Sequence, residues 1–292
     1  LMVEVSAWPG YAAWMKWRRW KCMRLAIIGG TGVYDPAILD GVREAVIQTP
    51  YGPASMKIGK YRGQEIAFVA RHGFGHTVPP HMINYKANIA ALKILGVERV
   101  IATSAVGSLN PEMKPGMFVF VDQFIDFAKS QVRTFFDGGE HGVVHLDYSE
   151  PYCPEIRAKM EEGARALGIE AINGGCYVCL DGPRFETPAE IRMFAMLGGH
   201  LAGMTGVPEA VLAREAQLCY ASIAMVTNWA AGISDTALTH QEVVDIMQAN
   251  GGKLRAVIMA AIDGLPIERG CACAEAGVEM PWLEEFKEGA SR

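Results

Sequence analysis

Polar residues that suit phosphate binding recur where apolar segments of this sequence end. A glycine turn spans 29–32, and backbone N–H groups in such a turn converge on anions. The guanidinium of an arginine forms a planar fork that matches phosphate oxygens, and a neighbouring protonated histidine adds a donor. The candidate phosphate ligands are Thr31, Arg71, His72, Ser104, Ala105 and Thr205. These loops hold no carboxylate cluster of the kind that binds Mg²⁺, so the inventory favours inorganic phosphate over a nucleoside triphosphate.

A second group of residues suits a heterocyclic base. Phe185 and Glu186 follow a Gly-Pro turn, which presents an aromatic face and a carboxylate together. Asn228 ends a strongly apolar segment, where a buried amide needs a hydrogen-bond partner. A base could stack on Phe185 and bond to Glu186 and Asn228. Each residue also has a structural explanation, as a core aromatic, a helix-start carboxylate or a satisfied buried amide.

The elements that must position these residues alternate between strand and helix along the chain. Apolar periodicity predicts helices over 84–96, 154–167, 187–197, 208–216 and 239–262. Strands are expected from residue 24 into the glycine turn, as a hairpin over 59–71, and over 97–104, 117–127, 175–180, 201–205 and 220–228. This order predicts an α/β fold, a single domain with a central mixed β-sheet flanked by helices on both faces. Ligands in such folds bind beyond the carboxyl ends of the strands.

Composition excludes several classes of protein. The 292 residues carry 27 basic and 32 acidic side chains, a net charge of −5, which argues against a nucleic-acid binder. Mean hydropathy is +0.13, but no apolar run approaches the ~20 residues of a membrane span. The seven cysteines are odd in number and do not resemble a secreted disulfide framework, so we expect a cytoplasmic protein.

The cysteines and the two ends of the chain raise separate questions. Cys176 and Cys179 lie in an apolar run and are interpreted as strand residues rather than a redox motif. Cys271 and Cys273 are too closely spaced for a zinc knuckle without partners, which leaves a local or intersubunit disulfide open. Residues 1–23, rich in Trp and Arg, are expected to be an extension outside the fold or, alternatively, a membrane-surface helix. The domain is predicted at 24–270, with a tail at 271–292.

The quoted residues resemble the trimeric branch of the purine nucleoside phosphorylase and methylthioadenosine phosphorylase family. The matching stretches include IIGGTGVYD, RHGFGHTVPPHMINYKANIAAL, TSAVGSL, DGPRFETPAE and MTGVPEAVLAREAQ, in the family's order between residues 24 and 240. The resemblance implies reversible phosphorolysis, in which a nucleoside and phosphate give a free purine and ribose 1-phosphate, as in purine salvage. It implies no metal and no organic cofactor, because phosphate is a co-substrate.

Site roles also follow from the resemblance. Thr31, Arg71, His72, Ser104, Ala105 and Thr205 resemble the family's phosphate site, Met204 the residue against the ribose, and Phe185 the one that stacks on the purine. Asn228 resembles the residue that assists the departing base at N7, which makes it, with His72, a candidate catalytic residue.

Two positions predict a 6-oxopurine. The adenine-specific relatives carry aspartate where this chain has Asn228 and Ala230. An amide can donate to a 6-oxo group and accept from N7–H. Glu186 can accept the N1–H of hypoxanthine or guanine, which neutral adenine lacks. The chain is therefore expected to cleave inosine and guanosine.

The sequence leaves two alternatives for the group that the substrate carries at its 5′ position. His240 resembles the histidine that binds a 5′-hydroxyl, whereas methylthio-specific relatives have an apolar side chain there. His240 could instead be a solvated residue at a helix start. The overall sequence looks closer to the methylthio branch, so the alternative is a phosphorylase for S-methyl-5′-thioinosine or methylthioadenosine that yields 5-methylthioribose 1-phosphate. The family forms homotrimers with sites near subunit interfaces, and residues 135–145, including His145, are a candidate segment lent to a neighbouring site.

Three rival functions fit the sequence less well. A nucleoside-binding module without chemistry would not need the intact phosphate residues. A nucleosidase would use water and have no use for Arg71, Ser104 and Thr205. A dinucleotide-dependent oxidoreductase fits poorly, because no acidic residue follows the glycine turn in a second strand to bind a ribose.

Overall fold

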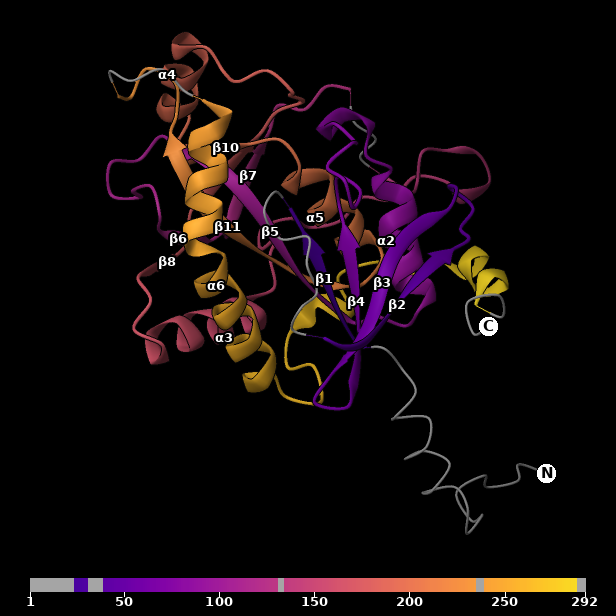
Figure 1. Cartoon of the computed structure of the whole chain (residues 1–292). Coiled ribbons are helices and arrows are strands. Elements are labelled where there is room, and N and C mark those ends of the chain that lie inside the picture. The colour runs from indigo at the N-terminus through magenta and orange to yellow at the C-terminus, as the bar shows by residue number, and fades with distance from the viewer. Residues whose placement is uncertain (1–23, 31–38, 131–133, 235–238, 288–292) are drawn as a thin grey trace, which may run out of the picture.

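A mixed β-sheet forms the centre of the computed structural model, which describes residues 24–30, 39–130, 134–234 and 239–287 and, among these, all side chains except that of His240 (Figure 1). The described residues contribute eleven strands in the order β2-β3-β4-β1-β5-β10-β9-β7, with β11 beside β5 and β6, and β8 beside β6. Their bounds are β1 Leu25–Gly29, β2 Asp40–Ile47, β3 Ala54–Tyr61, β4 Gln64–Ala70, β5 Arg99–Ser108, β6 Phe118–Phe120, β7 Gln123–Asp126, β8 Ala171–Asn173, β9 Cys176–Cys179, β10 Leu201–Gly203 and β11 Cys219–Trp229.

The middle of this sheet is parallel and buried on both faces. Strand β1 pairs in parallel with β4 and β5, and β5 pairs in parallel with β11. All five residues of β1 are buried, as expected for a central strand covered by helices. The carboxyl ends of these four strands therefore meet at one edge, where the polar residues of the predicted site follow them.

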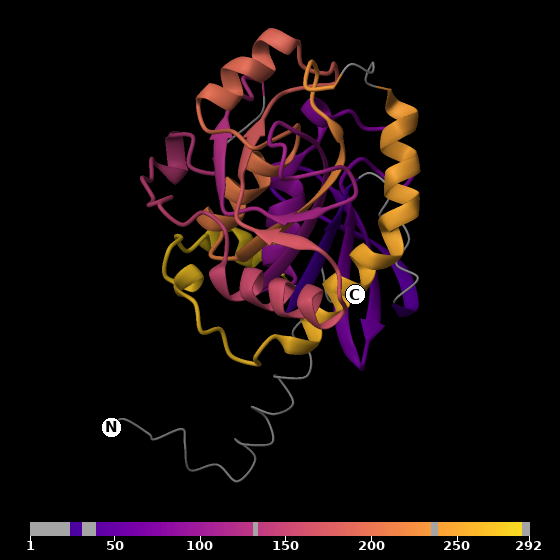
Figure 2. The same cartoon turned by 90° about the vertical axis from the view of Figure 1, so that its left-hand side faces the viewer.

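Helices cover both faces of the sheet, which confirms the predicted fold class (Figures 1 and 2). Helices α2 and α5 contribute to one hydrophobic cluster, and α3 and α6 contribute to another. Helix α4 packs with β9 and β10 in a smaller third cluster. The helices span α2 Tyr85–Ile94, α3 Pro154–Ala166, α4 Pro188–Met196, α5 Gly206–Glu215 and α6 His240–Gly264.

Local sequence explains where several elements begin and turn. Asn84 caps α2 by accepting from Ala87 N at 3.0 Å, and Thr187 forms a capping box with Glu190 at the start of α4. The predicted β3–β4 hairpin turn is confirmed at Arg62 and Gly63, which both have positive φ, as a tight two-residue turn requires.

Three expectations about the strands were wrong. The strand expected over 97–104 continues to Ser108 as β5, because β11 and β10 pair with residues 105–108 on both sides. The expected strand over 117–127 is two strands, since β6 pairs with β11 whereas β7 pairs with β9. Strands β2 and β8 were not foreseen. Strand β2 is largely exposed and so lacks the buried alternation that marks a strand in sequence.

The C-terminal segment packs on the domain. It crosses from the end of α6 to the face that carries α2 (Figure 1). Short 3₁₀ helices span Ala272–Ala274 and Pro281–Phe286, and Leu283 is buried in the same cluster as α2. Trp282 Nε1 donates to Tyr51 Oη at 3.1 Å. No helix among the described residues is long and apolar enough to cross a membrane. The extension 1–23 lies outside the described residues.

Candidate active site

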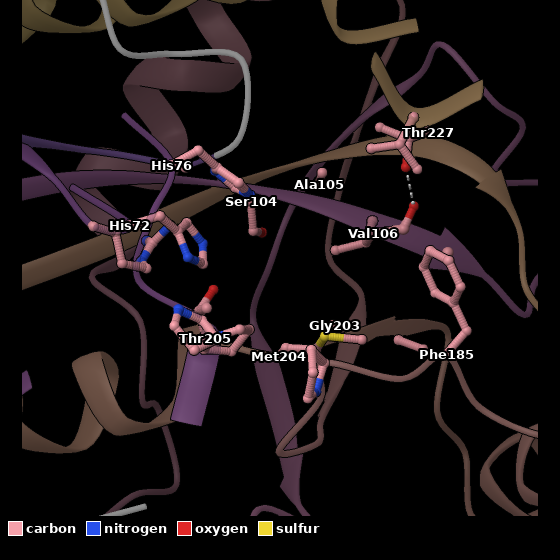
Figure 3. A pocket seen from close by; sticks show the side chains of 18 of the residues that line it. His72, His76, Ser104, Ala105, Val106, Phe185, Gly203, Met204, Thr205 and Thr227 are labelled. Atoms are coloured by element: carbon pink, nitrogen blue, oxygen red, sulfur yellow. Dashed lines mark hydrogen bonds between the residues drawn. The ribbon is translucent and has the colours of Figure 1, made fainter. Parts of the chain in front are cut away.

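A cavity of about 400 Å³ opens at the carboxyl ends of β1, β5 and β11 (Figure 3). Nine of the twelve predicted site residues line it: Arg71, His72, Ser104, Ala105, Phe185, Glu186, Met204, Thr205 and Asn228. Figure 3 shows two ends of this cavity, with His72, Ser104 and Thr205 at one end and Phe185 and Thr227 at the other. We call these the phosphate end and the base end, after the expected ligands.

The other three predicted residues are not among the described residues that line the cavity. Thr31 and the His240 side chain lie outside the described parts of the structure, although α6 begins at His240 and Val243, one turn later, lines the cavity. Ala230 is only 2% exposed and packs in the third hydrophobic cluster, so it does not line the cavity.

Arg71 is held rigidly at the phosphate end. Its Nε and Nη2 donate to Glu209 Oε1 and Oε2 at 2.5 and 2.8 Å, and Nη1 donates to the Thr103 carbonyl at 2.8 Å. Burial alone would lower the pKa of Arg71, but the charge and hydrogen bonds of Glu209 raise it above its ordinary value. A guanidinium has five N–H groups, so one on Nη1 and one on Nη2 remain for a ligand.

Glu209 is a site residue that sequence reasoning missed. It is fully buried in α5 and also accepts a hydrogen bond from Tyr220 Oη at 2.9 Å. A buried carboxylate needs such partners, because an unpaired charge in the interior is costly. The available signal was a lone acidic residue in the otherwise apolar run 206–213, which faces inward rather than toward solvent.

Ser104 is an unpartnered buried hydroxyl aimed at the same end. Its Oγ is buried and has no hydrogen-bond partner among the described residues. Buried polar atoms are normally paired, so an orphan lining a cavity indicates a missing ligand. Next to it, Gly30 N donates to Thr103 Oγ1 at 2.9 Å. A Cβ on Gly30 would lie 2.7 Å from the Thr103 carbonyl oxygen, so this position requires glycine.

The surroundings of His72 favour its neutral form. Burial and the neighbouring Arg71 charge lower its pKa to about 4. Nδ1 lies 2.9 Å from the Val78 carbonyl oxygen, which fixes the proton on Nδ1 and leaves Nε2 as an acceptor. His76, which also lines the cavity, packs against His72 with ring centroids 4.8 Å apart.

Thr205 lies at the start of α5, whose positive dipole end faces this part of the cavity. Its backbone N–H and that of Gly206 donate to Tyr177 Oη at 3.2 and 3.4 Å. These two backbone N–H groups are therefore paired within the chain. Gly203 makes room for the phenol, because a Cβ there would lie 2.2 Å from Tyr177 Oη.

A β-bulge presents Asn228 at the base end. The register between β11 and β5 shifts between Val226 and Asn228, which inserts Thr227 as an extra residue. Both Thr227 and Asn228 consequently line the cavity. Asn228 Oδ1 accepts from Thr227 Oγ1 at 2.7 Å, and Asn228 Nδ2 donates to the Trp229 carbonyl at 2.9 Å. Each end of the amide retains one hydrogen-bonding position for a ligand.

Phe185 and Glu186 complete the base end. Phe185 is 40% exposed, an unusual state for an aromatic side chain in a pocket wall, and its ring points into the cavity (Figure 3). Glu186 is the single carboxylate among the described lining residues. Burial raises the pKa of its carboxyl. Met204 lines the cavity between the two ends, next to Gly182, where a Cβ would displace the Met204 sulfur.

The described residues at this cavity place hydrogen-bond donors at one end and an aromatic ring, a carboxylate and an amide at the other, at the carboxyl edge of an α/β sheet. Residues 24–263 match the family model described as Phosphorylase superfamily. The chain belongs to this family, which confirms the resemblance to purine nucleoside and methylthioadenosine phosphorylases.

Individual relatives carry more specific names. The chain is 61% identical over 252 residues to a probable 6-oxopurine nucleoside phosphorylase of Moorella thermoacetica, a match covering 86% of this chain and 97% of that protein. It is 49% identical to a probable S-methyl-5′-thioinosine phosphorylase of Methanothermobacter thermautotrophicus, with coverage of 86% and 88%. A solved methylthioadenosine phosphorylase from an antarctic soil metagenomic library superposes with a TM-score of 0.82, at 35% identity and with coverage of 88% and 92%.

Proposed function

We propose that this protein catalyses the reversible phosphorolysis of 6-oxopurine nucleosides, inosine and guanosine, to the free base and ribose 1-phosphate. One observation carries the proposal: Arg71 and the orphan hydroxyl of Ser104 share a single cavity with Asn228 and Glu186. An anion cradle and a base pocket in one cavity fit a reaction in which phosphate attacks the sugar carbon attached to the base.

The phosphate end holds the phosphate nucleophile in position and stabilises its negative charge. Phosphate oxygens accept from the two free N–H groups of Arg71 and from the Ser104 and Thr205 hydroxyls. The C1′–N9 bond breaks as the C1′–O bond to phosphate forms, through a ribosyl cation that the phosphate anion stabilises. The dianion favours protonation of His72, whose Nε2 then donates to it.

The base end stabilises the leaving purine. Asn228 Nδ2 has one N–H left to donate to the 6-oxo group. N7 of the nucleoside carries no proton, so the purine anion released from C1′ takes one at N7 from solvent, and Asn228 Oδ1 has one lone pair left to accept from that N7–H. Glu186 accepts from N1–H, and the exposed face of Phe185 stacks on the ring. Adenine has no N1–H and presents an amino group where O6 would be, so this arrangement discriminates against it.

A second candidate substrate differs at the 5′ position. S-Methyl-5′-thioinosine presents the same base to Asn228 and Glu186, and the relative from Methanothermobacter is named for that activity. Val243, on the first turn of α6, provides an apolar contact at the cavity wall. His240 precedes it by one turn, and we propose that it binds a 5′-hydroxyl.

The first experiment is phosphate-dependent base release measured side by side on inosine, guanosine, methylthioinosine, adenosine and methylthioadenosine. Preference for inosine and guanosine supports both the base and the 5′ assignments. Preference for methylthioinosine keeps the base assignment and moves the protein to the second candidate. Preference for methylthioadenosine contradicts the role given to Asn228. Equal release without phosphate would indicate a nucleosidase.

Replacing His240 with valine tests the 5′ assignment. The His240→Val variant should lose about tenfold in kcat/KM for inosine, the cost of one hydrogen bond, while methylthioinosine is spared. Steady-state kinetics on both nucleosides gives the ratio. Equal losses on the two substrates would refute a contact with the 5′-hydroxyl.

We also propose that the protein is a cytoplasmic homotrimer that uses no cofactor besides its co-substrate phosphate. Within the segment 135–145, Phe135 and Phe136 are buried in the core of their own chain, whereas Val143 is 69% exposed and His145 is exposed. The exposed end of this segment is therefore the part available to a neighbouring subunit. Light scattering coupled to size exclusion would measure the assembly, and a monomer with full activity would contradict the proposal.

A further inference from the structure

Four cysteine thiols converge on one point at the end of the molecule opposite the cavity. The Sγ atoms of Cys153, Cys219, Cys271 and Cys273 all lie within 4.8 Å of one another. Cys271 Sγ is 3.4 Å from Cys219 Sγ and 3.6 Å from Cys153 Sγ. All four are free thiols in the structure.

These separations have the scale of a tetrahedral metal site. A zinc ion bound at about 2.3 Å by four thiolates holds the sulfurs roughly 3.8 Å apart. A disulfide brings two sulfurs to about 2.05 Å and places no demand on a second pair. Here one sulfur, that of Cys271, is close to two others on different elements, which is the pattern of a shared centre rather than of isolated pairs.

The ligands come from three parts of the chain that are distant in sequence. Cys153 precedes α3, Cys219 is the first residue of β11, and the other two flank Ala272 in the C-terminal segment. Backbone hydrogen bonds fix the first two, from Cys153 N to the Tyr220 carbonyl at 2.8 Å and from Cys219 N to the Glu98 carbonyl at 2.9 Å. Ligands held in this way are preorganised for a metal.

Neighbouring polar contacts position the other two ligands. Gly270 N donates to Glu155 Oε2 at 3.0 Å, and Gln217 Nε2 donates to the Ala274 carbonyl at 2.9 Å. Cys153, Cys219 and Cys273 are buried, with exposures of 1%, 0% and 5%, and Cys271 is partly buried. Four protein ligands in a closed setting leave no open position for a substrate, which is typical of a structural site.

We propose that these four cysteines bind one Zn²⁺ ion and that this site fastens the C-terminal segment to the domain. Zinc is the appropriate class of ion, because four soft thiolates in a tetrahedral arrangement select it over Mg²⁺, Ca²⁺ or Mn²⁺. Cys271 and Cys273 alone are too few and too closely spaced to form a zinc site. The fold brings Cys153 and Cys219 next to them as the two further ligands. The segment so anchored continues to Trp282, which bonds to Tyr51 on the far side of α2.

The site is separate from the phosphorylase chemistry. Cys219 begins β11 and Asn228 lies nine residues along it, a distance of roughly 30 Å in an extended strand. The readout is therefore metal content and stability rather than turnover.

The experiment measures zinc in the full-length protein purified under reducing conditions. Elemental analysis should find about one zinc per chain, and titration with a mercurial reagent should release it. Cobalt(II) substituted for zinc should show the intense visible bands of a tetrahedral thiolate site. Thermal unfolding after chelation should move the Tm down by roughly 5–10 °C.

Variants locate the metal. Cys153→Ser and Cys273→Ser should each lose most of the bound zinc, whereas Cys176→Ser, a cysteine outside the cluster in β9, should keep it. If the cluster variants fail to fold, the cobalt spectrum of the unmodified protein still decides the question. A protein without stoichiometric zinc and cobalt bands, or one whose intact mass is four hydrogens lower because two disulfides have formed, overturns the proposal.

Discussion

The two ends of the cavity are built in opposite ways. At the phosphate end, Arg71 and Glu209 are buried and each makes two or more hydrogen bonds within the chain. At the base end, Phe185 is 40% exposed and Glu186 sits on a loop before α4. Arg71 is therefore fixed before any ligand arrives, whereas Phe185 and Glu186 have surfaces that a ligand must complete.

This difference separates what the reaction requires from what selects the substrate. Stabilising a ribosyl cation with phosphate needs donors that do not reorganise, so those donors are buried and braced. Selection among purines needs only a few hydrogen bonds whose loss leaves a buried group unpaired. Changes at the phosphate end should therefore abolish turnover, and changes at the base end should redistribute it among substrates.

The largest effect is expected from Arg71→Met. The variant loses its guanidinium donors and should lose on the order of 10³ in kcat/KM for every nucleoside. It also leaves Glu209 buried without its partner, at a cost of about 3–5 kcal/mol in the free energy of unfolding. Steady-state kinetics and denaturant unfolding measure the two losses.

A double variant, Arg71→Met with Glu209→Gln, separates these effects. Removing both charges should restore much of the stability and none of the activity. As a control, Arg99→Met removes another buried arginine that does not line the cavity and should leave the KM for phosphate unchanged. Recovery of turnover in the double variant would contradict a direct role for Arg71.

Asn228→Asp should change the choice of base. The amide that can serve a 6-oxo group becomes a carboxyl that can protonate N7 of adenine, so the inosine-to-adenosine ratio of kcat/KM should fall by roughly 10². Adding Ala230→Asp should cost stability instead, because Ala230 is buried among apolar side chains. Asn250→Asp, the same change at a buried site in α6, should leave the ratio unaltered. An unchanged ratio in Asn228→Asp would refute the amide argument.

Glu186→Gln should have a smaller and more selective effect. Losing the carboxylate acceptor for N1–H should lower kcat/KM for inosine and guanosine by about 10- to 100-fold, with adenosine unaffected. Because burial raises the pKa of Glu186, binding of 6-oxopurines should also weaken as the pH falls toward that pKa, and the variant should lose this dependence. Glu190→Gln, in the first turn of α4 and paired with Arg184, is the control.

The smallest effect is a proton linkage at His72. Its pKa is about 4 in the free site, and a bound phosphate dianion raises it, so at a pH between the two values His72 takes up a fraction of a proton when phosphate binds. Phosphate that binds as the dianion also releases its own proton at a pH below its second pKa, so the measured quantity is the net number of protons exchanged. Calorimetry in buffers of different ionisation enthalpy should show fewer protons taken up, or more released, by His72→Gln than by the unmodified protein, and no such change in His200→Gln, whose Nδ1 accepts from Cys176 N outside the cavity. The same net proton exchange in His72→Gln and in the unmodified protein would contradict the assignment.

Sequence predicted the residues that line the cavity better than the residues that support them. Arg71, Ser104 and Asn228 end or lie within apolar strands, and polar residues in those positions stand out from their neighbours. Glu209 did not stand out, because a single acidic residue on a helix is usually solvated. The cysteines that lie next to Cys271 were not predicted for a different reason. Contacts between residues more than fifty positions apart leave no local pattern in the sequence.

Strand pairing also limited how accurately the strands could be predicted from the sequence. The expected strand over 97–104 stops before the glycine and serine of 105–108, but pairing with β10 and β11 extends the strand through them. The bulge at Thr227 depends on the register between two strands and has no signature in either one alone. The fold class, by contrast, follows from the order of apolar segments, and it was predicted correctly.

The bulge at Thr227 has a consequence for how enzymes of this architecture diversify. Up to Val226, β11 keeps a strict register with β5, which ties it to Ser104 at the phosphate end. Beyond Thr227, the register is shifted by one residue, and Asn228 pairs with Gly107. A mutation that alters purine preference downstream of this joint need not disturb the catalytic end upstream. The part of β11 before the bulge and the part after it can therefore change separately. Substitutions after the bulge can alter purine preference while the residues before it stay the same.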